Sequence, residues 1–249
     1  MWRTRLCAAL GACLLAVPAV AECRAEQVEG QGYVICAVDV AADLRLFLND
    51  PETGTLLGSF AGVDAHLGKA GERLAFAMNA GMYHGDRRPV GLYIEDGLEI
   101  APLVTREGPG NFGLLPNGVF CLRGGRVEVI ETLRYAQERP ECSYASQSGP
   151  MLVIDGALHP RFLIDSDSRY IRNGVGTSDD GRAWFVISDA PVNFHRFGRV
   201  FRDRLGAEQA LYFDGKVSRL YAPRLGRNDL GFPLGPMVGL VVDADTPLD

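Results

Sequence analysis

Lysine is nearly absent from this sequence, and that scarcity limits the partners expected for the protein. Only Lys69 and Lys216 occur, so arginine supplies nearly all of the positive charge. The acidic residues outnumber lysine and arginine by 31 to 25, which gives a formal net charge of −6. Because binding to nucleic acid needs a basic surface, we expect no nucleic-acid partner.

Long apolar runs are also missing, since no segment after residue 21 is long and apolar enough to span a membrane. The first 21 residues have the three parts of a signal peptide: Arg3 and Arg5, the apolar run Leu6–Val17, and the small-residue site Ala19-Val20-Ala21. We therefore predict that residues 1–21 are removed, which takes the formal net charge from −6 to −8.

Cleavage after Ala21 makes residues 22–249 a periplasmic or secreted protein without an integral membrane segment. A lipid anchor on Cys23 is the alternative, but Glu22 stands where lipoprotein signals need a small residue.

Cysteine is scarce, and no two cysteines have the CxxC spacing of zinc or redox sites. Four cysteines remain after cleavage, namely Cys23, Cys36, Cys121 and Cys142. An even number in an exported chain favours disulfides. Three pairings are possible, and we favour Cys23–Cys36 with Cys121–Cys142 because each closes a local loop. Four buried thiols remain the alternative.

Several well-known catalytic motifs are missing. The sequence has no HExxH pair and no GxSxG elbow, and Ser148 has no spacing that supports a serine triad. We therefore expect no transition metal and no cofactor. A calcium ion on the acidic loop residues is possible in principle, without EF-hand spacing to support it. These residues are Asp165, Asp167, Asp179 and Asp180.

Glycine is abundant, at 30 residues, and it separates many short apolar runs, which is typical of a strand-rich protein. Helices are predicted at Ser59–Ala70, at Thr132–Glu138 and from Asn193 to Leu205. No linker or repeat divides the chain. The sequence thus predicts a single α+β domain of mixed, mostly antiparallel twisted sheets with a few packed helices. Further strands and turns are predicted at Gly32–Asp39, Leu44–Leu48, Leu74–Met78, Val90–Glu95, Leu98–Ala101, Val127–Ile130, Met151–Ile154, Ala183–Ser188, Gln209–Phe213 and Met237–Val242, with hairpins over Asn111–Phe120 and about Asp179-Asp180-Gly181.

Polar side chains follow several of these strands directly, where a rigid scaffold can hold them over a site. Asn79 follows a buried strand, Asp214 follows another, and Ser148 precedes Gly149-Pro150. From residue types alone, Asp214-Gly215 is equally well a hairpin turn, and Arg172 an ion-pair partner within the fold.

Four motifs in this order resemble those of the phosphodiester glycosidase family, in particular a bacterial exported branch of it. They span about residues 74–220, and each follows or adjoins a predicted strand. The motifs are Asn79-Ala80-Gly81-Met82, Gln147-Ser148-Gly149-Pro150, Arg172-Asn173-Gly174-Val175-Gly176 and Asp214-Gly215 with Ser218. Members often have Asp-Gly-Gly-Gly-Ser where this chain has Lys216 and Val217 in place of two glycines. We expect that difference to affect which substrate is bound more than it affects the fold.

The resemblance implies cleavage of a sugar-1-phosphodiester on the sugar side, through an oxocarbenium-like state that carboxylates stabilise. It implies that Asp214 is the catalytic carboxylate and that Arg172 binds phosphate or orients that carboxylate. The remaining members would donate hydrogen bonds to sugar hydroxyls or phosphate, and these are Asn79, Gln147, Ser148, Asn173 and Ser218.

The expected substrate is a phosphorylated sugar or glycan of an envelope or capsule polymer. Two other functions stay open: a non-catalytic binder of phosphorylated glycans, and a metal-assisted phosphodiesterase. His84, His195 and Asp189 lie close to the motifs in the sequence, and we interpret them as surface, supporting or helix-capping residues. The sugar, the aglycone and the oligomeric state are not predicted.

Overall fold

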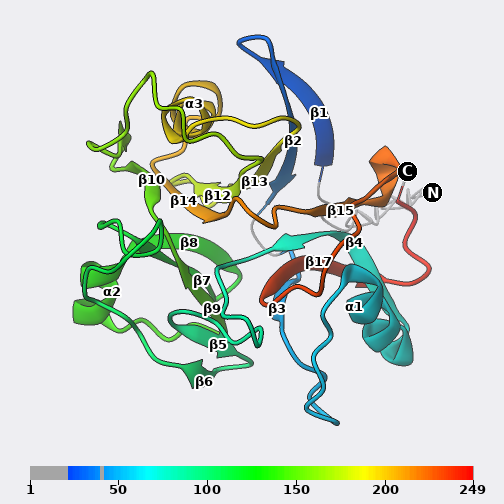
Figure 1. Ribbon diagram of the computed structural model, residues 1–249. Coiled ribbons are helices and arrows are strands. Elements are labelled where there is room, and N and C mark those ends of the chain that lie inside the picture. The colour runs from blue at the N-terminus through cyan, green and yellow to red at the C-terminus, as the bar shows by residue number, and fades with distance from the viewer. Residues whose placement is uncertain (1–21, 40–41, 249) are drawn as a thin grey trace, which may run out of the picture.

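The computed structural model describes residues 22–39 and 42–248. In this part of the chain the strands form three sheets, and three short α-helices pack against them (Figure 1). All strand pairs among the described residues are antiparallel. The predicted single α+β domain is confirmed. The predicted signal peptide, residues 1–21, lies outside the described residues.

The first sheet contains the central strand β12, which opens with Asn173. Its order is β1 (Glu22–Val28), β2 (Gln31–Val38), β13 (Ala183–Ser188), β12 (Asn173–Thr177), β14 (Gln209–Asp214), β10 (Met151–Ile154) and β11 (Ala157–Leu158). Asn173 pairs with Ile187 on one side and with Asp214 on the other. The predicted hairpin about Asp179-Asp180-Gly181 is confirmed, since it joins β12 to β13.

The second and third sheets each supply one strand that ends at the motifs. The second has the order β16 (Arg227–Asn228), β15 (Leu220–Ala222), β4 (Glu72–Asn79), β17 (Met237–Asp243) and β3 (Leu44–Phe47). The third has the order β6 (Leu98–Ala101), β5 (Tyr93–Glu95), β9 (Tyr144–Ser148), β7 (Gly118–Arg123) and β8 (Arg126–Glu131). β4 ends at Asn79 and β9 at Ser148, so the chain turns at each motif.

A common core lies between the three sheets. Phe76 of β4, Phe120 of β7 and Phe185 of β13 bring one aromatic ring from each sheet, with centroids 5.2 and 5.9 Å apart for Phe76–Phe185 and Phe120–Phe185. Phe213 of β14 meets Phe120 edge-on at 5.7 Å. Because successive residues of a strand point to opposite faces, Phe213 in the core fixes Tyr212 and Asp214 on the other side.

The outer face of each sheet is covered by a helix (Figure 1). The helices are α1 (Phe60–Leu67, extended by η1, Gly68–Ala70), α2 (Thr132–Glu138) and α3 (Phe194–Arg199, extended by the π-helical turn η2, Val200–Arg204), with a further short turn η3 (Pro223–Leu225). The side chains of Ser59 and Asn193 cap α1 and α3. No helix among the described residues has the length and apolarity needed to cross a bilayer.

Some sequence predictions of local structure are wrong. Asn111–Phe120 does not form a hairpin, since residues 111–117 are irregular. β7 pairs with β8 through a turn at Gly124-Gly125, which leads into the predicted strand Val127–Ile130. The edge strand β1 is not predicted, because its polar sequence Glu22–Val28 lacks the apolar alternation of a buried strand. Its partner β2 has both faces buried, which explains why its apolar residues show no one-sided pattern.

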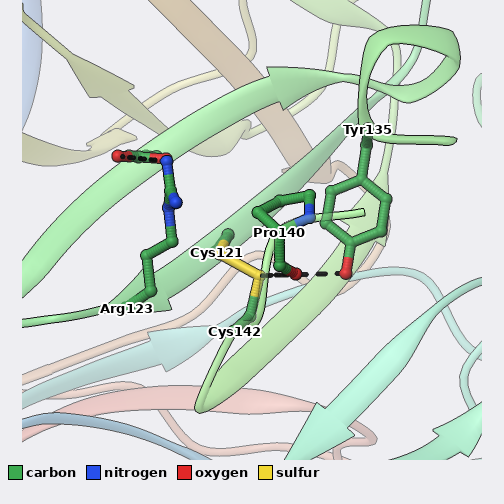
Figure 2. The surroundings of a disulfide bond; sticks show 6 residues. Cys121, Arg123, Tyr135, Pro140 and Cys142 are labelled. Atoms are coloured by element: carbon green, nitrogen blue, oxygen red, sulfur yellow. Dashed lines mark hydrogen bonds and ion pairs between the residues drawn. A yellow bond between two sulfur atoms is a disulfide. The ribbon is translucent and has the colours of Figure 1, made fainter. Parts of the chain in front are cut away.

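Both predicted disulfides are present. Cys23–Cys36 joins the paired strands β1 and β2, with Cα atoms 3.9 Å apart. Cys121–Cys142 ties β7 to the segment before β9, with Cα atoms 5.6 Å apart, beside the Tyr135 ring of α2 (Figure 2). Both Cα distances lie below the separation of about 7 Å beyond which two cysteines cannot be bridged.

The Cys121–Cys142 bond should contribute strongly to stability because it closes a long loop. The sequence separation is 21 residues, for which the chain-entropy relation gives roughly 3 kcal/mol. We expect Cys121→Ala with Cys142→Ala to lower the free energy of unfolding by about that amount in urea titrations. A loss below about 0.5 kcal/mol would show that the bond does not stabilise the fold.

Candidate functional site

The polar motifs meet where strands from all three sheets end. Asp214 ends β14 and Asn173 opens β12 in the first sheet, Asn79 ends β4 in the second, and Ser148 ends β9 in the third. The connection from β14 to β15 passes from the first sheet to the second and carries Ser218. The structure therefore brings these five residues, distant in sequence, to one junction.

A pair of buried asparagines joins two sheets at this junction. The Asn173 side-chain nitrogen donates to the Asn79 backbone carbonyl at 2.7 Å and lies 3.2 Å from its side-chain oxygen. The Asn79 side-chain nitrogen in turn lies 3.3 Å from Asn173 Oδ1. Both side chains are fully buried, so the pair fixes the relative position of β12 and β4.

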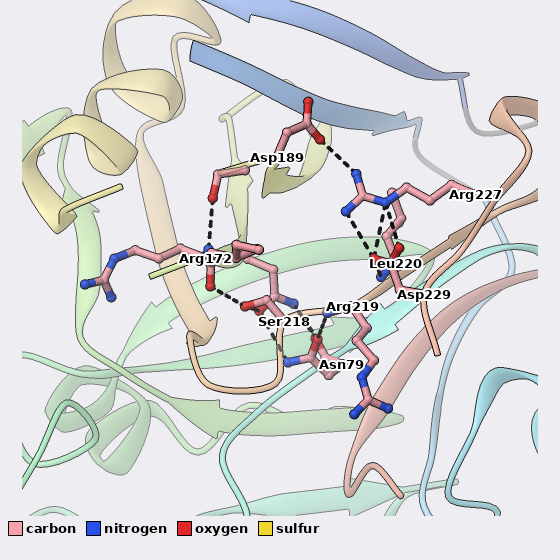
Figure 3. A network of polar contacts seen from close by, with 11 residues as sticks. Asn79, Arg172, Asp189, Ser218, Arg219, Leu220, Arg227 and Asp229 are labelled. Carbon is pink, nitrogen blue, oxygen red and sulfur yellow. Dashed lines mark hydrogen bonds and ion pairs between the residues drawn. The ribbon is translucent and has the colours of Figure 1, made fainter. Parts of the chain in front are cut away.

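The loop after β14 is anchored to the same two asparagines (Figure 3). Asn173 Oδ1 accepts the backbone N–H of Asp214 at 3.2 Å, and Asn79 Oδ1 accepts the backbone N–H of Arg219 at 2.9 Å. The Ser218 hydroxyl lies within 2.7 to 3.2 Å of three acceptors: the carbonyls of Asp214 and Ile171, and Asn173 Oδ1. These contacts hold Asp214 in one position.

The third sheet reaches the junction through Gln147 and Ser148. The buried Ser148 hydroxyl donates to the Phe213 carbonyl at 2.9 Å, one residue before Asp214. The Gln147 amide accepts the N–H groups of Leu92 and Val104 and donates to the Val104 carbonyl and the Thr132 hydroxyl. Its hydrogen-bonding capacity is thus used by the protein itself.

Asp214 is partly buried, and burial raises the pKa of its carboxyl above the ordinary value. Backbone N–H groups of the following residues, Lys216 first, lower the pKa and oppose that effect. Asp214 Oδ1 accepts the N–H groups of Gly215 and Lys216, whereas Oδ2 takes no part in these two bonds. Among the described residues Asp214 forms no ion pair.

Arg172 is fully buried, and its guanidinium points away from Asn79 and Ser218 (Figure 3). Its carbon Cζ lies 3.6 Å from the centroid of the Phe194 ring, and its Nε and Nη2 donate to the carbonyls of Val192 and Ser168. Nη1 has no hydrogen-bond partner within the described residues, and no carboxylate there forms an ion pair with the guanidinium. Burial lowers the pKa of Arg172.

Tyr212 contacts the guanidinium of Arg172 and lies against the loop that follows Asp214. The Arg172 Cζ is 5.2 Å from the centroid of its ring. Burial is the main reason that the pKa of Tyr212 is raised, while the positive charge of Arg172 lowers that pKa and the negative charge of Asp214 raises it. A Cβ on residue 215 would lie 2.1 Å from the Tyr212 hydroxyl. Gly215 therefore allows the loop of Asp214 to pass over this phenol.

Sequence reasoning missed two tyrosines of this site. Tyr212 lies two residues before Asp214 on the same face of β14, so period-two alternation could have identified it. Tyr83 lies in the loop after Asn79; burial raises its pKa, and the negative charge of Asp214 raises it further.

The remaining candidates have other contacts. Asp189 pairs with Arg227 at 2.9 Å, and α3 is capped by Asn193 instead (Figure 3). His84 is exposed, and His195 is half-buried in the first turn of α3. In residues 22–39 and 42–248 no group of three or more metal-ligating side chains is close enough to hold an ion.

A cavity of about 590 Å³ lies elsewhere, between α1, β3 and β5. Its cations are already neutralised: Arg45 binds Glu72 at 2.8 Å, and Lys69 binds Asp50 at 3.1 Å. Charges paired in this way leave little attraction for an anionic ligand, so this cavity is the weaker candidate.

Comparisons with known proteins agree with the geometry. The chain matches the phosphodiester glycosidase family over residues 72–231. It is 36% identical to a protein of Escherichia coli K12 named Uncharacterized protein YigE. The aligned segment has 168 residues and covers 68% of this chain and 65% of that protein. The chain thus spans less than two thirds of that relative's length.

Two solved structures share the fold at 11% sequence identity. One is the zebrafish N-acetylglucosamine-1-phosphodiester alpha-N-acetylglucosaminidase catalytic domain auto-inhibited by pro-peptide, with a TM-score of 0.60 over 88% of this chain and 81% of that one. The other is a putative exported protein from Burkholderia pseudomallei K96243, with a TM-score of 0.55 over 84% and 74%. The family match covers more than half of the chain and all the motifs at the sheet junction, and the protein therefore belongs to the phosphodiester glycosidase family.

Proposed function

We propose that this protein hydrolyses a sugar-1-phosphodiester on the sugar side, with Asp214 as the catalytic carboxylate. The observation that supports this most is a pair of unbalanced charges. The Asp214 carboxylate and the Arg172 guanidinium both shift the pKa of Tyr212, and neither forms an ion pair within the described residues. Because a buried charge without a partner is costly, such a pair favours a site for a charged ligand.

The proposed reaction breaks the bond between the anomeric carbon and the phosphate oxygen. That oxygen leaves with the bonding electrons as a phosphate monoester, and a water oxygen ends on the sugar. The positive charge that develops on the ring is stabilised by ionised Asp214 through Oδ2, the oxygen that the N–H groups of Gly215 and Lys216 do not use. Phosphate is a good leaving group, so the reaction needs no strong general acid.

Arg172 acts in this proposal as a positioning residue. Its Nε and Nη2 bind backbone carbonyls, and its guanidinium packs against Tyr212 and thus fixes the phenol next to the Asp214 loop. Nη1 has no hydrogen-bond partner within the described residues. We assign the remaining motif side chains to holding the junction, since their hydrogen bonds go to the protein. These are Asn79, Gln147, Ser148, Asn173 and Ser218.

We also propose that the protein works outside the cytoplasm, on a phosphorylated glycan of the envelope or capsule. Two disulfides support export, because such bonds persist in oxidising compartments. The similarity to a protein described as exported agrees with this location.

Asp214→Asn should separate catalysis from binding. The amide keeps the shape and the loop contacts but loses the charge that stabilises the transition state. We therefore expect kcat on a panel of sugar-1-phosphodiesters to fall by at least about a hundredfold while affinity changes far less. The matched control is Asp179→Asn, an exposed aspartate in the β12–β13 turn, which should keep full activity.

Hydrolysis in ¹⁸O-labelled water identifies the bond that breaks. Label in the sugar supports the proposal. Label in the phosphate would mean phosphorus–oxygen cleavage, and binding without turnover in the parent protein would mean a non-catalytic glycan binder.

The same substitution should affect stability in a pH-dependent way. Burial raises the pKa of Asp214 in the folded state, so the folded protein favours the protonated carboxyl. That contribution to stability is present at low pH and is lost as the pH rises through the raised pKa. We expect Asp214→Asn to melt at or above the parent temperature at pH 7, with a difference that shrinks below about pH 4. A lower melting temperature at pH 7 would contradict the burial argument.

The losses of unfolding free energy caused by substituting Asn79 and Asn173 should not be additive. Asn173→Ala removes a hydrogen-bond partner from the Asp214 N–H, from the Asn79 backbone carbonyl and from the Asn79 side-chain amide, which should cost roughly 2 to 4 kcal/mol of unfolding free energy. Asn79→Ala should cost a similar amount, and the double variant should cost less than the sum by about 1 kcal/mol. Urea titration measures this, with exposed Asn228→Ala as the control. Additive losses would refute the coupling.

A further inference from the structure

Among the motif residues of the proposed site, no cation is accessible to a substrate phosphate. Arg172 is the one cationic residue of the four motifs, and it is fully buried against aromatic rings. A phosphodiester is negatively charged before and after its cleavage, and arginine and lysine are the side chains that bind such a charge directly. Cations outside the motifs are therefore needed to bind it.

The loop between β14 and β15 supplies two cations directly after Asp214. Lys216 is exposed and Arg219 is half-buried, and no carboxylate of the described residues forms an ion pair with either. The Lys216 backbone N–H donates to Asp214 Oδ1 at 2.9 Å. Burial raises the pKa of Asp214, and the positive charge of Lys216 lowers it. The backbone of Lys216 is thus fixed beside the carboxylate, and its side chain is in solvent.

Arg219 is held in place at its backbone and at its guanidinium. Its backbone N–H donates to Asn79 Oδ1 at 2.9 Å, and its Nη1 donates to the Phe232 carbonyl at 2.6 Å. A Cβ on residue 231 would lie 2.2 Å from Arg219 Nη2, so Gly231 leaves room for the guanidinium. Figure 3 shows this side chain beginning beside Asn79 and extending away from the guanidinium of Arg172. A group ordered in advance loses less entropy when it binds a ligand.

Carboxylates around this loop are paired with another arginine. Asp229 accepts the backbone N–H of Leu220, directly after the loop, and pairs with Arg227 at 3.1 Å. Arg227 pairs in turn with Asp189 at 2.9 Å. Residues 161–171, before β12, contain two aspartates and two arginines and so add no net charge. The loop therefore has two cations against one carboxylate, in a protein of formal net charge −6, and such a local excess attracts anions.

The charges of Arg219 and Asp214 both act on Tyr83. Burial raises the pKa of this phenol, the negative charge of Asp214 raises it further, and the positive charge of Arg219 lowers it. Tyr83 also packs against the segment that binds Arg219, since a Cβ on residue 235 would lie 2.6 Å from its ring. These contacts agree with a single site that contains both charges.

We infer that Lys216 and Arg219 bind the phosphate group of the substrate. This inference rests on the proposed function, which puts the anomeric carbon at Asp214. Arg219 offers a fixed guanidinium whose Nε and Nη2 take no part in the bond to Phe232, and Lys216 offers an ammonium group on a flexible stem. The same two side chains hold the phosphate monoester after cleavage, so inorganic phosphate competes with the substrate.

Binding of inorganic phosphate tests the assignment without turnover. Dissociation constants are measured by calorimetry at constant ionic strength for the parent, Lys216→Gln, Arg219→Gln and the double variant. We expect each single variant to bind phosphate at least about fivefold more weakly, and the double variant at least about twentyfold. Arg219→Lys keeps the charge and should bind phosphate more tightly than Arg219→Gln. A parent that binds no phosphate, or a double variant with the affinity of the parent, would overturn the inference.

Two control variants separate a local site from an effect of net charge. Lys69→Gln replaces the other lysine of the chain, which pairs with Asp50. Arg126→Gln replaces an exposed arginine of β8. Both should keep the phosphate affinity of the parent within about twofold, and equal losses in the controls would refute the site. Urea titration shows which variants fold; if Arg219→Gln does not, Lys216→Gln decides the test, because its side chain is exposed.

Kinetics on the panel of sugar-1-phosphodiesters distinguish this inference from the proposed function. Cleavage turns a phosphodiester monoanion into a monoester that can carry two negative charges, so the double variant should lose at least about twentyfold in kcat/KM. Turnover by the parent with an unchanged kcat/KM in the double variant would refute the inference alone. A parent without turnover, whose phosphate binding is lost in the double variant, would refute the glycosidase proposal and support the phosphate site.

Discussion

The contact between two buried carboxamides, Asn79 and Asn173, is the interaction on which the site depends. It joins the end of one sheet to the start of a strand in another, and the same oxygen atoms hold the backbone on both sides of the loop after β14. Neutral amides suit this task because each offers both a donor and acceptors and carries no charge that would need compensation. The two neutral carboxamides therefore fix the position of Asp214 without supplying a positive charge to balance its carboxylate.

The guanidinium of Arg172 is enclosed by aromatic side chains. Arg172 is surrounded by Phe194, Tyr170 and Tyr212, and its bonds go to backbone carbonyls. In a typical buried ion pair a carboxylate would bind the guanidinium directly. Here the guanidinium packs against the Tyr212 ring, and no carboxylate of the described residues pairs with it. The fold thus leaves the charges of Arg172 and Asp214 without ion-pair partners among the described residues, an arrangement suited to a ligand with charge of its own.

Much of the architecture could be predicted from sequence because local signals agree with the fold. Asn193 and Ser59 cap helices in the structure, and turn residues such as Asp179-Asp180-Gly181 connect paired strands. The edge strand β1 could not be predicted, since its polar residues acquire strand structure only by pairing with β2. For the site, the motifs identified the residues that meet at the junction. The direction of the side chains was not predictable, because it depends on the neighbouring loops. Gln147 forms its hydrogen bonds with Leu92 and Val104, and Arg172 points away from Ser218.

The close approach of Gly215 to the Tyr212 hydroxyl has an evolutionary consequence. A side chain at position 215 and a phenol at position 212 compete for the same volume, since a Cβ would lie 2.1 Å from the hydroxyl oxygen. Substitutions at the two positions are therefore expected to covary among homologues: alanine at 215 becomes acceptable once a smaller residue occupies 212. Residues 216 and 217, which are exposed and half-buried, are free of this constraint and can diverge, which gives a physical reason why lysine and valine replace glycines there while the Asp-Gly pair remains.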